Sequence, residues 1–166
     1  LLLTFHRGFD LGDEGMHLLL YKYPQEYKVT IYNHHYLVTA LLPSSWINVF
    51  NLRVAWLTGE LAGGIVLFCG CIAFMRGRGI KVTSTDTALF LLSGANALAL
   101  SIHDRIIGYN SISNLLLNTS AGLLLFALPS KQYSLRNGWL IAGAFFLVAV
   151  QFFIKPTAAL GALLLE

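Results

Sequence analysis

The chain has 166 residues, of which 56% are hydrophobic and only 11% charged, and its formal net charge is +3. An average soluble domain carries about 25% charged residues, and a soluble chain this short could not bury so much apolar surface. The composition therefore excludes an ordinary soluble domain and predicts an all-α, polytopic transmembrane helical bundle.

The first segment, residues 6–51, is too polar to span a membrane and too apolar to be a simple loop. It opens with three carboxylates and an imidazole in the stretch "FDLGDEGMHLL": Asp10, Asp13, Glu14 and His17. The following stretches, "MHLLLYKYPQEY" and "HHYLVTALLPSSWINVF", mix aromatic residues with leucines. This composition predicts amphipathic helices that lie in the membrane interface, with Tyr and Trp at the depth of the headgroups.

Apolar runs occupy the rest of the chain, and a spanning helix needs about 20 mostly apolar residues. The runs are 52–75, 85–102, 112–128 and 139–154, and a fifth, "AALGALLLE", follows directly. We therefore expect one membrane domain over residues 1–166, with four to five transmembrane helices in 52–166. Small residues would let these helices approach closely: Gly63, Gly64, Gly94 and Ala95. The ends of the sequence suggest an N-terminal fragment of a longer membrane protein.

The connections between the runs predict an orientation. The basic connections are "RGRGIK", with Arg76, Arg78 and Lys81, and "SKQYSLRNG". Short loops rich in Lys and Arg remain in the cytoplasm. Segment 6–51, the connection "HDRIIGYNS" and the sequence "KPT" would then share the non-cytoplasmic side. The basic residues form no patch interleaved with aromatics, so nucleic acid is not expected as a partner.

The acidic cluster has two interpretations. If "DEGMHLL" opens a helix, Asp13 and Glu14 share a face with His17 at spacings i, i+4 and i, i+3. Carboxylates are favoured near a helix N-terminus, so a capped, solvated helix start would explain them. In the functional interpretation, a carboxylate takes the proton from an attacking hydroxyl. Glu14 and His17 would then also be candidate ligands of a divalent metal ion.

Two histidines and two intramembrane charges also have both a structural and a functional interpretation. His34 and His35 either sit in the headgroup zone or contact a substrate or phosphate; neighbouring helical residues diverge, so at most one should point inward. Arg53, near the outer end of the first span, could simply extend its head group to the membrane surface. Glu60 lies deeper, where it would pair with another helix or face a polar cavity.

Polar residues at the outer ends of the later runs are further candidates. A stripe of asparagines at every fourth position (Asn110, Asn114, Asn118) would either bond neighbouring helices or, with Tyr109, line a sugar or phosphate pocket. Lys155, just before Pro156, is either an interfacial anchor or a phosphate ligand.

The stretch "RGFDLGDEGMHLL" resembles the acidic motif in the first outer loop of the GT-C integral-membrane glycosyltransferases, such as the protein O-mannosyltransferases and lipid A aminoarabinose transferases. "GYNSISNLL" and "FIKPTAALGALLL" are similar to later segments of bacterial members. The resemblance implies a multi-pass protein of the bacterial inner membrane and a polyprenyl-phosphate-linked sugar donor. It implies Asp13 as the catalytic base, Glu14 beside it and Asp10 as a second candidate. Substrate contacts would come from His17, His34, His35, Arg105, Tyr109, Asn110 and Lys155.

Two other functions stay open: a transporter or flippase, and a non-catalytic membrane scaffold. Transporters keep their ionisable residues near the bilayer midplane. The acids of this chain cluster in an outer loop, which favours the enzyme, whereas Glu60 favours the transporter.

Overall fold

The computed structural model describes residues 13–26, 33–88, 94, 107–129, 134–157 and 160. Within these ranges the regular elements are all helical, as the composition predicted, and no strand occurs. In chain order they are α1 (Asp13–Lys22), α2 (His34–Leu41), the short 3₁₀ helix η2 (Ser44–Trp46), α3 (Val49–Gly77), a helical stretch over 84–88, α5 (Tyr109–Ala127) and α6 (Leu135–Ile154).

The longest helix, α3, has a local signal at each end. Asn48 is extended, and its side-chain oxygen accepts the Asn51 backbone N–H at 2.9 Å, which caps the first turn. At the other end Gly79 adopts a φ of +79°, and the Ile80 N–H donates to the Met75 carbonyl at 3.0 Å. The run expected at 52–75 therefore lies inside a helix that begins at Val49.

The later runs also lie in helices. α5 begins at Tyr109 rather than at 112, because the Ser111 hydroxyl accepts the Gly108 N–H at 2.8 Å and stabilises an earlier first turn. α6 contains the whole run 139–154 and ends before Pro156, which disfavours helical geometry in the preceding residue. Most of 85–102 and of the fifth run lies outside the described residues.

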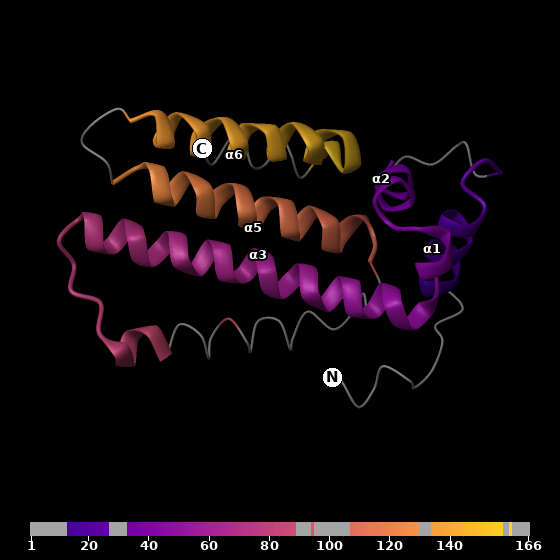
Figure 1. The fold of residues 1–166 in the computed structure, drawn as a ribbon, viewed down its shortest axis with the longest axis horizontal. Coiled ribbons are helices and arrows are strands. Elements are labelled where there is room, and N and C mark those ends of the chain that lie inside the picture. Colours follow the sequence, from indigo (N-terminus) through magenta and orange to yellow (C-terminus); the bar gives the residue numbers. More distant parts are fainter. Residues whose placement is uncertain are drawn as a thin grey trace.

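Two glycines bring α3 and α5 into backbone contact. α5 packs along α3, and α6 packs along α5 (Figure 1). A Cβ added at Gly70 would lie 2.9 Å from the Gly122 Cα, and one added at Gly122 would lie 2.7 Å from the Val66 carbonyl carbon. Gly63 also packs closely, since its Cβ would lie 3.3 Å from the Leu115 Cα. These contacts hold the two helices closer than larger side chains would allow.

Of the four small residues expected at close contacts, only Gly63 is shown in that role. A Cβ at Gly64 or at Gly94 would meet nothing within 4 Å. Ala95 lies outside the described residues. Gly70 and Gly122, which bring the backbones of α3 and α5 into contact, were not singled out from the sequence.

Two of the described helices, α3 and α6, are long and apolar enough to cross a membrane. Both expose large apolar side chains: Leu61 and Ile65 on α3, and Phe145, Phe146 and Phe153 on α6. Exposed apolar surface of this kind marks a protein or membrane contact. Length, composition and exposed surface thus agree on association with a membrane.

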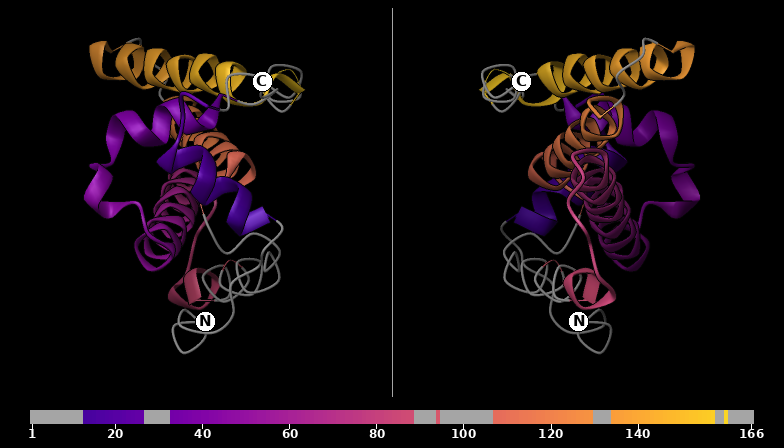
Figure 2. Two further views of the ribbon diagram at one scale, coloured as in Figure 1. Left: turned by 90° about the vertical axis from the view of Figure 1, so that its right-hand side faces the viewer. Right: turned by 90° about the vertical axis from the view of Figure 1, so that its left-hand side faces the viewer.

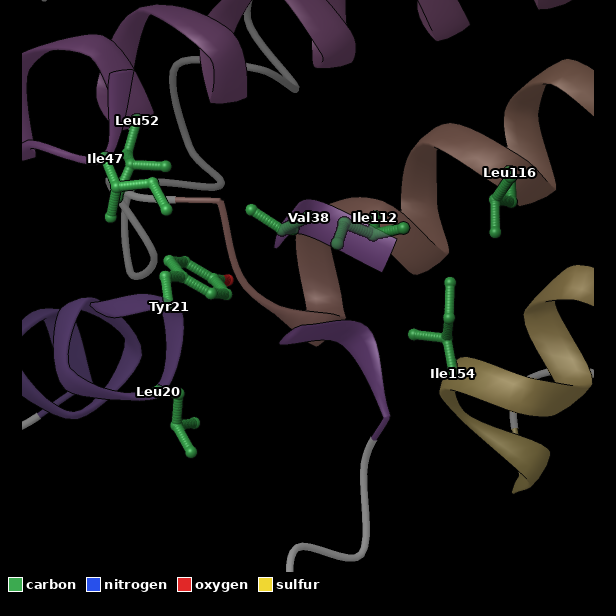
Figure 3. Packing of buried hydrophobic residues seen from close by; sticks show 8 residues of the cluster. All are labelled: Leu20, Tyr21, Val38, Ile47, Leu52, Ile112, Leu116 and Ile154. Carbon is green, nitrogen blue, oxygen red and sulfur yellow. The ribbon is translucent and has the colours of Figure 1, made fainter. Parts of the chain in front are cut away.

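The short helices α1 and α2 lie at the end of the bundle where α3 and α5 begin and α6 ends (Figures 1 and 2). A hydrophobic core joins α1, α2, α3, α5 and α6 there (Figure 3): Leu20, Tyr21, Val38, Ile47, Leu52, Ile112, Leu116 and Ile154. The exposed basic residue Arg76 lies in the last turn of α3, at the other end of the bundle, and the exposed Arg78 and Lys81 follow this helix. The bundle therefore has a basic end and an end covered by α1 and α2.

Candidate functional site

One face of α1 carries polar side chains into the protein. Glu14, His17 and Tyr21 are all buried, whereas Met16 and Leu19 on the other face are exposed. The expected shared face of Glu14 and His17 is therefore present, and it faces the helix bundle rather than bulk water. Asp13 is the first residue of α1, but its side chain is outside the described part of the structure.

Glu14 and Arg53 form a buried, two-pronged ion pair between α1 and α3. The Arg53 Nε donates to Glu14 Oε1 at 3.1 Å, and Nη2 donates to Oε2 at 2.7 Å. Their side chains are only 7% and 3% exposed, respectively. The Arg53 head group is therefore paired inside the protein rather than exposed to solvent. Paired guanidinium and carboxylate groups in this fork geometry satisfy each other and cancel in charge.

His17 and His34 join α1 to α2 through a shared hydrogen bond. His34 Nε2 lies 3.0 Å from His17 Nδ1, and both rings are buried. One of the two nitrogens must donate and the other accept, so the pair shares one proton along this bond. Gly108 leaves room for His17, since a Cβ there would lie 2.8 Å from His17 Nε2.

Contrary to the expectation that only one of the adjacent histidines points inward, both are buried: His34 is 2% exposed and His35 1%. They occupy the first turn of α2, at the covered end of the bundle. The His35 ring also packs on Tyr36, with ring centroids 4.0 Å apart. Both side chains of this first turn are therefore covered by protein.

Tyr21 fixes α1 to the start of α5. Its hydroxyl donates a hydrogen bond to the Ile107 carbonyl. Burial of the side chain raises the pKa of Tyr21 far above its ordinary value. Tyr21 is therefore a neutral donor with a structural role.

Lys155 closes the site from α6. Its ammonium group donates to the Asn110 side-chain oxygen at 2.7 Å and lies 5.3 Å from the centre of the Tyr109 ring. The same tyrosine ring lies 6.1 Å from His17 and 5.7 Å from His34, between ring centroids. Within the described residues, no carboxylate lies within 4.0 Å of the Lys155 ammonium. Its positive charge is therefore not cancelled there.

We call the following residues the polar cluster: Glu14, His17, His34, His35, Arg53, Tyr109, Asn110 and Lys155. The structure thus brings together seven residues that the sequence proposed as site residues. Two others, Asp10 and Arg105, lie outside the described residues. With neutral histidines, the Glu14–Arg53 pair cancels and the described cluster keeps the single positive charge of Lys155.

The proposed metal ligands Glu14 and His17 are both in the cluster, but both carboxylate oxygens of Glu14 receive hydrogen bonds from Arg53. No group of three or more metal-ligating side chains occurs among the residues that the structure describes. His17 instead faces another imidazole. These contacts give no support to a cation held by Glu14 and His17, and the metal ion stays an untested expectation.

Two asparagines of the expected stripe bond to neighbouring helices. Asn110 receives the hydrogen bond from Lys155 on α6, and the Asn114 side chain is hydrogen-bonded to Glu60, which is buried on α3. This agrees with interhelical bonding, one of the two interpretations left open by the sequence.

Sequence reasoning missed the partners rather than the residue types. Arg53 was noticed as an intramembrane charge, but its partner is 39 positions away. Gly108 carried no signal in the sequence, because its importance comes from the ring of His17 that packs against it.

Comparison with known proteins gave no relative for this arrangement: no family model matches the chain, and neither the curated proteins nor the solved structures contain a match.

Proposed function

We propose that the chain belongs to a multi-pass protein of the bacterial inner membrane that transfers a sugar from a polyprenyl-phosphate donor to an acceptor hydroxyl on the non-cytoplasmic side. The observation that carries this proposal is Lys155, a half-buried cation with no carboxylate partner among the described residues. It lies beside Tyr109 and Asn110, at the end of the bundle. A lysine in such a setting suits a phosphate group, to which it presents a compact positive charge.

The distribution of charge supports the orientation. Arg76, Arg78 and Lys81 lie at the end opposite the polar cluster, and short basic loops remain in the cytoplasm. The polar cluster would then lie at the outer membrane boundary, with α1 and α2 as interfacial helices. A lipid-linked donor keeps its tail among the acyl chains and presents its phosphate at this depth.

The acidic motif supplies the base. Because Arg53 occupies both oxygens of Glu14, Asp13 is the better candidate of the two, and Asp10 remains the second. The acceptor oxygen attacks the anomeric carbon while the bond from that carbon to the phosphate oxygen breaks. The Asp13 carboxylate takes the acceptor proton, and polyprenyl phosphate leaves with the bonding electrons. Lys155 stabilises the negative charge that develops on this leaving group.

The test is donor turnover by the full-length protein in detergent. A panel of polyprenyl-phosphate hexoses and pentoses, labelled in the sugar, is supplied, and release of polyprenyl phosphate is measured. Asp13→Asn should reduce kcat by about 10²- to 10⁴-fold, the usual contribution of a general base. Lys155→Gln should reduce kcat by about 10²-fold or more, as expected for loss of a charge-stabilising donor.

Matched controls come from the opposite end of the bundle. Asp86→Asn and Lys81→Gln change an exposed carboxylate and an exposed ammonium, and turnover should stay at the wild-type level. Full activity of a folded Asp13→Asn variant would show that Asp13 is not the base. Absence of turnover with every donor would refute the transfer reaction. Turnover that is lost on chelation and restored by Mg²⁺ would establish a role for a divalent cation.

A transporter or flippase is the second candidate, and one observation favours it. Glu60 is buried within the spanning helix α3 and bonded to Asn114 on α5. Ionisable residues inside spanning helices often mark a transport path. Glu60→Gln separates the two functions: it would stop substrate movement by a transporter but leave sugar transfer at the outer boundary intact.

A further inference from the structure

Gln151 on α6 has a hydrogen-bonding requirement that the described protein does not meet. Its side chain is 0% exposed. The side-chain nitrogen donates to the Ser113 hydroxyl at 2.9 Å and approaches the Ser113 carbonyl at 3.4 Å. The side-chain oxygen has no hydrogen-bond partner within the described residues.

The orientation of this amide follows from its surroundings. A backbone carbonyl can only accept, so the nitrogen rather than the oxygen of Gln151 must face Ser113. The oxygen is thereby left as the unsatisfied atom. A buried acceptor without a donor is costly and rare in native proteins, which indicates that a donor from outside the described chain satisfies it.

Gln151 lies one helical turn from the phosphate-binding candidate. The Lys155 backbone N–H donates to the Gln151 backbone carbonyl at 2.7 Å, and residues four apart lie on the same side of a helix. Their partners are also one turn apart on α5: Asn110 for Lys155 and Ser113 for Gln151. Both pairs therefore belong to the same contact between α5 and α6.

We propose that Gln151 is a specificity-determining residue whose side-chain oxygen accepts a hydrogen bond from a hydroxyl of the donor's sugar, while Lys155 holds the phosphate to which that sugar is attached. This inference rests on the proposed sugar transfer. Because phosphate and sugar are directly bonded, neighbouring groups on one helix face can contact both. The oxygen is shielded in the structure, so the side chains at this end of α5 and α6 move apart when the sugar enters.

The test compares hydroxylated and deoxy donors. Wild-type protein is given a polyprenyl-phosphate hexose and the series in which one ring hydroxyl at a time is replaced by hydrogen. We expect one deoxy donor to be used about tenfold less efficiently by kcat/KM, since it leaves the buried oxygen unpaired. In Gln151→Leu, kcat/KM for the hydroxylated donor divided by kcat/KM for this deoxy donor should fall to near one.

Gln25→Leu is the matched control, since Gln25 is exposed after α1, and it should keep the wild-type ratio. The ratio compares two donors in one sample, so it does not depend on how much variant is folded. Gln151→Met, which keeps the volume, serves if Gln151→Leu does not fold.

The outcomes separate the two proposals. A wild-type enzyme that uses every deoxy donor equally well, or a Gln151→Leu variant that still discriminates, would overturn the role of Gln151 and leave sugar transfer standing. In that case a donor other than the sugar satisfies the oxygen. If the wild-type protein consumes no donor, the proposed function fails and the role of Gln151 fails with it.

Discussion

The Glu14–Arg53 pair joins α1 to α3 through two charge-assisted hydrogen bonds. Taking two charges out of water is costly, and the attraction between them repays this cost only when the geometry is good. Here both hydrogen bonds of the fork are present. The pair therefore contributes little net stability compared with apolar residues, but each partner depends strongly on the other.

This dependence gives a prediction for single and double variants. Glu14→Ala and Arg53→Ala should each lower the free energy of unfolding by about 3–5 kcal/mol, because each leaves one buried charge unpaired. The double variant Glu14→Gln with Arg53→Met should lose much less than the sum of the single losses. Unfolding in detergent, followed by circular dichroism, measures all three variants.

Glu26→Ala is the control at the residue scale, since Glu26 is exposed in the turn after α1 and its loss should change the midpoint little. If Glu14→Ala is no more harmful than Glu26→Ala, the buried ion pair does not exist in solution.

At the scale of elements, the contact between α3 and α5 depends on two glycines whose added Cβ atoms would collide with the opposite backbone. Helices in a membrane associate by packing and hydrogen bonding rather than by the hydrophobic effect, so the closeness of their backbones matters directly. The segment around Gly70 and Gly122 is therefore the tightest part of the α3–α5 interface.

Gly122→Val should force the helices apart and lower stability by at least about 1–3 kcal/mol, the usual cost of overpacking. Gly64→Val is the matched control. Gly64 lies on α3, the helix that Gly122 contacts, but a Cβ at Gly64 would meet nothing within 4 Å. Thermal unfolding of the two variants in the same detergent compares them. Equal midpoints would contradict the close contact.

The helices could be predicted from the sequence more fully than their ends. Apolar runs of sufficient length indicated α3, α5 and α6, because the backbone must bond to itself in a long apolar segment. The ends depend on single side chains: Asn48 starts α3 before the apolar run, and Ser111 does the same for α5. Such caps are short-range signals, and a search for apolar runs does not detect them.

At the scale of the whole molecule, the polar cluster combines residues of α1, α2, α3 and α5 with Lys155, which follows α6. The sequence indicated individual residues with suitable chemistry, but it did not predict which of them would pair. Lys155 and Asn110, for example, are 45 positions apart in the chain. Sequence spacing informs only on neighbours within a helix, such as Glu14 and His17. Contacts between helices follow from the packing of the bundle, which a single sequence does not reveal.

The two ends of the molecule also differ in charge, which predicts a fixed orientation. A cysteine placed at Gln25 should react with a membrane-impermeant maleimide added outside intact cells. One placed at Lys81 should react only after the cells are opened, because basic loops remain in the cytoplasm. The native Cys69 and Cys71 are first replaced by alanine. The reverse labelling pattern would place the polar cluster on the cytoplasmic side.

The hydrogen bond between Lys155 and Asn110 also has a consequence for biogenesis. Chains are made from the N-terminus, so Glu14, His17 and His34 leave the ribosome long before Lys155. In the topology that we propose, Glu14 can pair with Arg53 once α3 has inserted, but Lys155 joins the described part of the cluster only after α6 has crossed the bilayer. Under the proposed function, a ribosome stalled before residue 155 would leave α1 and α2 in place without the lysine that we expect to hold the phosphate.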